Sequence, residues 1–167
     1  MLDMKRKVPL LLLIVLLQGL PSQAQKILMK ITGISAVAGE EVSAVDFKFE
    51  ATSTWGPTGV TAGTIKTIPV LIKKSNGTST NELHKKLSTG TGLTPNVVLE
   101  YYNESNVLYF GITMLNAIVS NFYWLSPECP TCIKLEHQIA FNPRRIETFD
   151  VSTGITVGFD YQTKTTY

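Results

Sequence analysis

The chain has 167 residues and a formal net charge of +2, from 15 Lys and Arg against 13 Asp and Glu. Residues 1–24 hold three of the basic residues and one of the acidic residues, so residues 25–167 hold 12 of each and are formally neutral. The positive charge of the whole chain is therefore no sign of binding to nucleic acid or anionic membranes, and we expect no nucleic-acid partner. Residues 25–167 are long enough for one domain with a core of its own.

The first 24 residues have the pattern of a bacterial secretory signal peptide. Residues 5–7 are basic, residues 10–17 form an apolar run too short to span a bilayer, and residues 22–24 place small side chains before a cut ahead of Gln25. We therefore predict a cleaved leader, no membrane insertion, and a secreted or periplasmic protein formed by residues 25–167. An exported destination permits disulfide bonds.

Strand patterns dominate the N-terminal half of the remaining chain. Residues 27–33 are a short β run, and residues 43–51 alternate apolar and polar side chains as one strand would. Residues 52–64 are rich in Gly, Thr and Pro, which predicts a long, exposed loop. Residues 65–74 form another strand, where Pro69 favours an edge or a bulge because it donates no backbone hydrogen bond.

One short helix is predicted within residues 75–90. Ser79 and Glu82 have the spacing of a capping box, in which each side chain accepts a hydrogen bond from the other residue's backbone. An apolar stripe and a terminating glycine follow at helical spacing: Leu83, Leu87 and Gly90.

The C-terminal half returns to strands. Residues 96–102 and 107–114 flank a polar turn and predict a hairpin, whose second strand continues through residues 115–124 with a kink near Asn116. Further strands are predicted at 132–141, 144–150 and 154–162, the last with Ile155, Val157, Phe159 and Tyr161 on one apolar face.

These elements predict a mainly β fold, an antiparallel β-barrel or sandwich with one short α-helix on its flank. Several strands are apolar on both faces. This pattern predicts burial against another copy or a partner, with burial inside the fold as the competing interpretation.

The two cysteines, Cys129 and Cys132, lie in a C-x-x-C spacing, and the alternating residues that follow place them in a loop that enters a strand. A redox centre and a zinc site completed by His84 and His137 are two interpretations. The third, a local disulfide, is favoured in an exported protein. His137 lies on the apolar face of its strand, where a core or interface histidine is expected, and His84 is expected at the surface of the helix.

The order of these parts is similar to that of the Hcp (haemolysin-coregulated protein) family, the tube proteins of type VI secretion systems. Three stretches carry the resemblance, "KKSNGTSTNELHKKLSTG", "VVLEYYNESNVLYFGITMLNAIVSNFYW" and "IKLEHQIAFNPRRIETF", and the pattern extends over about residues 27–161. The secretory signal is a departure, because tube proteins of this family lack one.

The resemblance implies a small β-barrel with a flanking helix, hexameric rings that stack into a tube, and no catalytic residues or cofactors. Partners would be further copies of the chain, together with secretion-system or effector proteins. The stacking loop of the family corresponds to the region around Trp55, Gly56 and Pro57. Two alternatives stay open: a monomeric extracellular domain that binds a ligand or glycan through its aromatic residues, and a small thiol oxidoreductase.

Overall fold

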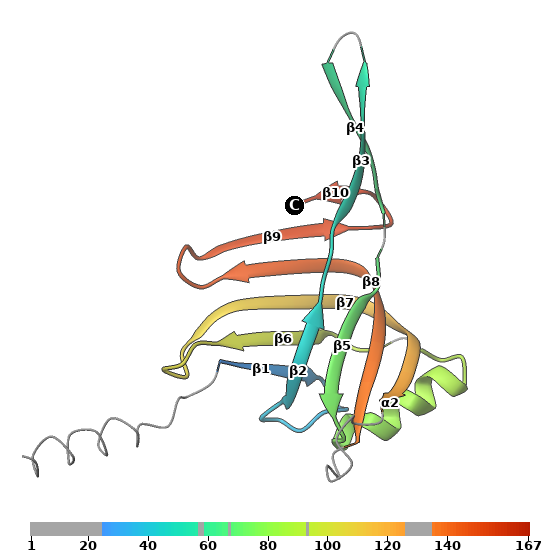
Figure 1. Ribbon diagram of the computed structural model, residues 1–167, viewed down its shortest axis with the longest axis vertical. Helices are drawn as coiled ribbons and strands as arrows, with labels where there is room; N and C mark the ends of the chain where they lie inside the picture. The colour runs from blue at the N-terminus through green and yellow to red at the C-terminus, as the bar shows by residue number, and fades with distance from the viewer. Residues whose placement is uncertain (1–24, 57–58, 67, 93, 126–134) are drawn as a thin grey trace, which may run out of the picture.

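The structure is a computed structural model, shown in Figure 1. It describes residues 25–56, 59–66, 68–92, 94–125 and 135–167, with only the backbone described at 51–56 and 59–64. The strands are β1 (Lys26–Ile31), β2 (Glu40–Asp46), β3 (Glu50–Gly56), β4 (Gly59–Lys66), β5 (Val70–Ser75), β6 (Val97–Tyr102), β7 (Leu108–Leu125), β8 (Glu136–Asp150), β9 (Ile155–Asp160) and β10 (Thr165–Thr166). The helix is α2 (Thr78–Ser88).

Six antiparallel strands close into a barrel. Their order is β8-β5-β2-β1-β6-β7, and β7 pairs in turn with β8 along almost the whole length of both strands. The predicted mainly β fold, an antiparallel barrel with one flanking helix, is confirmed. The core inside the barrel consists of fully buried aliphatic and aromatic side chains from all six strands, among them Met29, Val42, Ile72, Leu99, Met114, Ile139 and Phe141.

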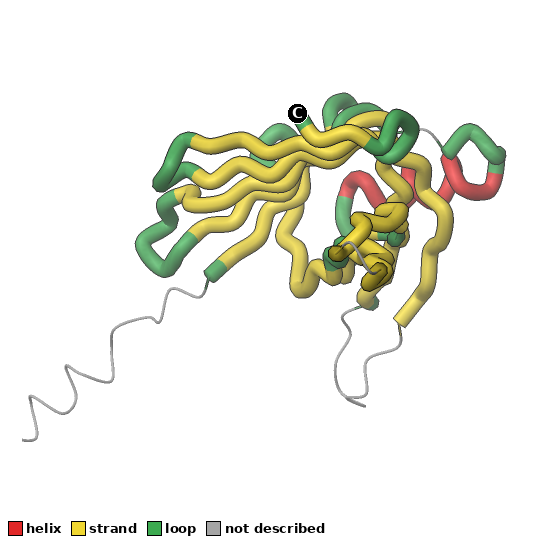
Figure 2. The backbone as a smooth tube through the Cα atoms, turned by 90° about the horizontal axis from the view of Figure 1, so that it is seen from above, coloured by secondary structure: helices red, strands yellow, loops and turns green. Residues whose placement is uncertain are grey.

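Strand β8 belongs both to the barrel and to a flat extension of it. Its first half, to Phe141, pairs with β5, whereas its second half, from Arg145, pairs with β9. The sheet of β1, β6, β7, β8 and β9 therefore continues beyond the barrel, as Figure 2 shows from above. Strand β10 adds a short pairing on the outer side of β9.

The predicted strand over residues 43–51 is divided between β2 and β3, and the predicted loop over 52–64 is wrong. Strand β2 ends at Asp46, and the strand pairing is interrupted where Phe47 and Phe49 pack edge to face with ring centroids 4.7 Å apart. Strands β3 and β4 then form a hairpin in a separate two-stranded sheet, on the side of the barrel away from α2 (Figure 1). Residues rich in Gly and Thr lack the apolar alternation that marks a strand, so this hairpin could not be predicted from local patterns.

Helix α2 begins earlier than the capping-box pattern indicates. Its N-cap is Gly77, and Ser79 lies inside the first turn, so the predicted box of Ser79 and Glu82 is wrong. The predicted apolar stripe and stop are confirmed: Leu83 is buried, Leu87 packs against the core, and Gly90 has a φ of 69°.

The predicted hairpin of residues 96–114 is confirmed as β6 and β7. The predicted kink is also confirmed: Asn116 has a φ of 50°, an uncommon value for a residue inside a strand, while β7 continues on both sides of it. In the part of the chain that is described, we find no helix with the length and apolar character needed to cross a membrane.

Candidate assembly surface

The extended part of the sheet has an apolar inner face. Residues that pair across antiparallel strands point to the same side, so the face can be followed by register. One row joins five strands, from β9 to β1: Ile155, Asp150, Phe110, Tyr101 and Ile27. The next row runs from Val157 through Thr148, Ile112 and Leu99 to Met29. In each row the residue on β8 is polar, and the other four are apolar or, in one case, tyrosine.

This face is covered at its barrel end and open at its β9 end. Met29, Leu99 and Ile112 are fully or almost fully buried. Ile155 and Val157 at the other end are 58% and 53% exposed. We call this end of the face the overhang face; it consists of the exposed Ile155 and Val157 and of Ile27, Tyr101 and Phe110, which are partly buried against the core. Exposed apolar side chains that lie next to one another, instead of singly, are typical of an interaction surface.

An apolar cavity of about 270 Å³ opens beside the overhang face. It lies between the start of the β3–β4 hairpin and strands β8 and β9, and its apolar lining includes Phe49, Ile65, Ile146, Val157 and Phe159. Phe49 is 49% exposed although its ring lies 6.4 Å from that of Phe159. The cavity therefore extends the apolar surface from the sheet onto the base of the hairpin.

The β3–β4 hairpin carries the residues predicted to stack rings. Trp55 pairs with Val60 and Gly56 pairs with Gly59, so the backbones of Trp55 and Gly56 lie at the tip of the hairpin. Pro57 lies outside the described residues. An isolated two-stranded hairpin is marginally stable in water, which favours a hairpin that packs on something else.

The outer face of the same sheet carries charged side chains as well as the exposed ring of Phe149. Arg145 donates to the Asp160 carboxylate, and this hydrogen bond, with backbone N–H groups of Thr163 and Gln162, lowers the pKa of Asp160 to about 2. The Tyr167 ring lies over Gly158, where an added Cβ would come within 2.5 Å of it, and its hydroxyl donates to Glu147 at 3.0 Å. The two faces of one sheet thus differ, with charges on the outside and apolar side chains on the overhang.

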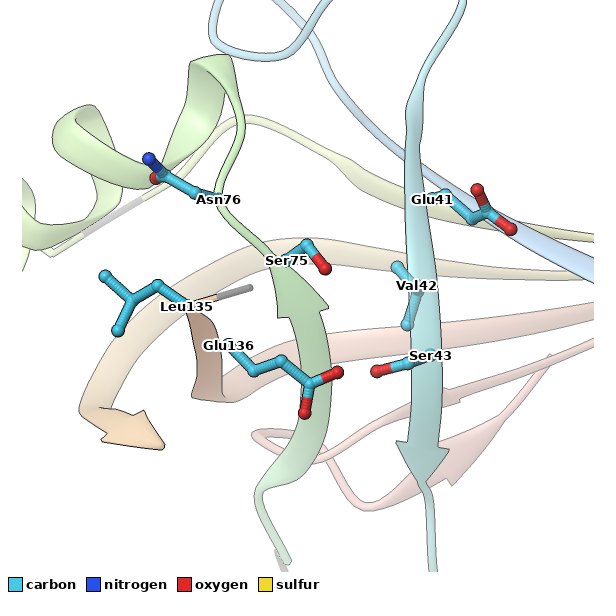
Figure 3. Close-up of a pocket in the computed structure, with 7 residues that line it drawn as sticks. All are labelled: Glu41, Val42, Ser43, Ser75, Asn76, Leu135 and Glu136. Carbon is cyan, nitrogen blue, oxygen red and sulfur yellow. The ribbon is translucent and has the colours of Figure 1, made fainter. Parts of the chain in front are cut away.

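A polar hollow of about 580 Å³ lies on the barrel wall where β2, β5 and the start of β8 meet. Figure 3 shows that Glu41 points away from Glu136, so these two carboxylates do not converge. Glu136 instead pairs with Lys73 at 3.0 Å. Neither a catalytic pair nor a cation site results from this arrangement.

The predicted redox and zinc residues are only partly placed. Cys129 and Cys132 lie outside the described residues, so the disulfide, redox and zinc interpretations stay untested predictions. His137 is fully buried and His84 is exposed, as predicted. Among the residues described, no three His, Cys, Asp or Glu side chains come close enough to hold a metal ion.

The fold resembles that of known proteins, whereas the sequence does not match closely. No family model matches the chain, and no curated protein sequence matches it. The crystal structure of Hcp1 from Salmonella typhimurium is 18% identical with a TM-score of 0.68, over 86% of this chain and 99% of that one. A type six secretion system protein is 13% identical with a TM-score of 0.73, over 86% of this chain and all of the other.

A more distant similarity extends to a phage-like particle. A chain in the 6-fold symmetrised baseplate of the anti-feeding prophage is 10% identical with a TM-score of 0.54, over 80% of this chain and 97% of that one. The matched chains are covered almost completely, so the similarity concerns the whole domain and not a shared fragment. This chain has the fold of the Hcp proteins.

Proposed function

We propose that this protein is a non-enzymatic structural component that assembles with copies of itself into rings, as a part of a type VI secretion-like apparatus. The proposal includes export through the predicted leader, a hexameric ring, and contacts between rings through the hairpin tip around Trp55, Gly56 and Pro57. Secretion-system or effector proteins are the further partners that it implies.

The overhang face is the observation that carries the proposal. The barrel is closed by six strands without β9, yet β9 extends the sheet and presents Ile155 and Val157 at more than half exposure. Burying apolar surface gains roughly 25 cal/mol per Å², so a second copy that covers this face gains free energy that the isolated chain does not. The Hcp fold, found also in a 6-fold baseplate, supports a ring as the form of that association.

A charge placed on the overhang face tests the proposal. Val157→Lys puts an ammonium group in the apolar row, whereas Thr156→Lys puts the same group on the opposite face of the same strand. We expect the protein of residues 25–167 to form rings by negative-stain microscopy and a multiple of the monomer mass by light scattering. Val157→Lys should give monomers, and Thr156→Lys should keep the rings.

A protein that stays monomeric at the highest attainable concentration, or rings that survive Val157→Lys, would exclude the overhang face as the assembly surface. A monomer that is also retained on a glycan array would favour the alternative of a ligand-binding domain.

A further inference from the structure

His137 occupies an unusual position at the end of the barrel closed by α2. Its side chain is fully buried, and neither ring nitrogen has a hydrogen-bond partner in the described part of the chain. Burying an imidazole without hydrogen-bond partners costs free energy, because both nitrogens lose the hydrogen bonds that they make to water in the unfolded chain. Protonation of such a histidine therefore has a large effect on the free energy of the closed state.

The neighbours of His137 are two aromatic rings and one cation. Lys74 on β5 and Trp124 on β7 pair with it on either side in the sheet. The Trp124 ring lies 4.5 Å from the imidazole and the Phe122 ring 5.3 Å, both between centroids. Helix α2 packs against this group through the exposed His84, whose ring centroid lies 6.2 Å from that of Trp124 and 5.5 Å from that of Phe122.

Among the residues that the structure describes, the charged groups around His137 leave no carboxylate for it. On β5, Lys74 is 1% exposed and already bound to Glu40 of β2 at 2.6 Å. On α2, Ser79 and Thr80 accept from Lys74, the His84 ring contacts the rings of Phe122 and Trp124, and Glu82 is exposed. On β8, Glu136 pairs with Lys73 instead. A second positive charge at His137 would therefore face Lys74 with no anion of its own from the described residues within 25–125 and 135–167.

We propose that His137 is an acid-responsive switch whose protonation opens the end of the barrel that α2 closes. The charged imidazole gains water only if α2 moves away from Trp124 and Phe122, and repulsion from Lys74 acts on the β5 side, where Lys74 also holds Ser79 and Thr80 of α2. The switch acts on one domain and is independent of ring assembly.

The direction of the pH dependence follows from the closed state. Burial first, and then the charge of Lys74, lower the pKa of His137 below its ordinary value. In the open state the pKa of His137 returns to about 6.5. The free energy of opening is therefore nearly constant above that pH and becomes more favourable as the pH falls below it. If the closed state stays unprotonated, opening at pH 5 is favoured by about 30-fold over opening at neutral pH.

Hydrogen exchange of the α2 amides measures this opening. On the untagged protein of residues 25–167, we expect protection factors in α2, corrected for the intrinsic pH dependence, to fall by about 30-fold between pH 7.5 and pH 5. Amides of β1 and β6, on the far side of the barrel, should change by less than about 3-fold. His137→Phe should abolish the fall, and His84→Gln, which removes the other of the two histidines, should leave it intact.

A second measurement keeps the test decisive if His137→Phe does not fold. In the His84→Gln protein, His137 is the one histidine, so its ring resonances are unambiguous in an NMR titration. We expect them to titrate together with the loss of α2 protection. Constant protection of α2 down to pH 5, a fall that persists in His137→Phe, or a His137 ring that titrates while α2 stays protected would each overturn the switch.

Discussion

The buried ion pair between Glu40 and Lys74 should stabilise the domain far more than its neighbour on the surface does. Lys74 is 1% exposed and Glu40 9% exposed, and their charged atoms lie 2.6 Å apart. Glu40 also accepts from the backbone and hydroxyl of Ser79, each at 2.7 Å, and from Thr78 at 2.6 Å. Glu40 thus performs the N-terminal capping of α2 that Gly77, with no side chain, cannot.

Lys74→Met is the perturbation that isolates the pair. It keeps most of the aliphatic stem inside the barrel and leaves the Glu40 carboxylate buried without its cation. Removing one partner of a buried pair costs about 3–5 kcal/mol, and the three hydrogen bonds that Glu40 retains place the expected loss near 3 kcal/mol. With a urea m-value of about 2 kcal/mol/M, the unfolding midpoint should fall by about 1.5 M.

The adjacent residue offers the matched control. Lys73 pairs with Glu136 at 3.0 Å on the outer face, where the side chains are 42% and 28% exposed. Lys73→Met should cost less than about 1 kcal/mol, as exposed pairs do. Urea unfolding of both variants at pH 7 gives the comparison, and a Lys74→Met protein that loses no more stability than Lys73→Met would refute the reasoning.

Two further predictions concern acid and backbone strain. Burial alone would raise the pKa of Glu40, but hydrogen bonds from Lys74, Thr78 and Ser79 outweigh burial and lower the pKa. The stability that Glu40 contributes is therefore present above about pH 4.5 and is lost as the pH falls through the pKa of Glu40 in the folded protein. Urea midpoints from pH 5 to pH 3 should therefore fall less steeply in Glu40→Gln than in the unaltered protein. Asn116→Val should lower stability by about 1–2 kcal/mol in thermal unfolding although valine favours strands, because the φ of 50° is strained for a β-branched residue. Asn116→Gly should not lower it, because glycine adopts positive φ freely.

Local patterns predicted the elements in which local signals and tertiary structure agree. The hairpin of β6 and β7 follows from two apolar runs around a polar turn, and the stripe of Leu83 and Leu87 follows from helical spacing. The alternation after Cys132 correctly placed His137 in the interior. In each case the residues that carry the signal lie within a few positions of one another.

Non-local contacts account for the errors. The cap of α2 comes from Glu40, which precedes the helix by more than 30 residues, so a search for a local capping box selected the wrong residues. The hairpin of β3 and β4 has Gly and Thr in place of apolar alternation, and its existence depends on pairing rather than on propensity. The apolar face of β9 was predicted correctly as a face, but alternation did not reveal that Ile155 and Val157 extend past the part of the barrel that buries Phe159.

The arrangement of β9 and β10 favours association through a face over association through an edge. Pairing by β10, together with Tyr167 on Gly158, covers the outer edge of β9 from Gly158 to Asp160. The inner face has no such cover at Ile155 and Val157. Strand β9 adds nothing to barrel closure and keeps its apolar side chains exposed, which fits a surface that another subunit packs against. Pairing through the edge is less favoured, because β10 and Tyr167 already occupy the Gly158–Asp160 half of that edge.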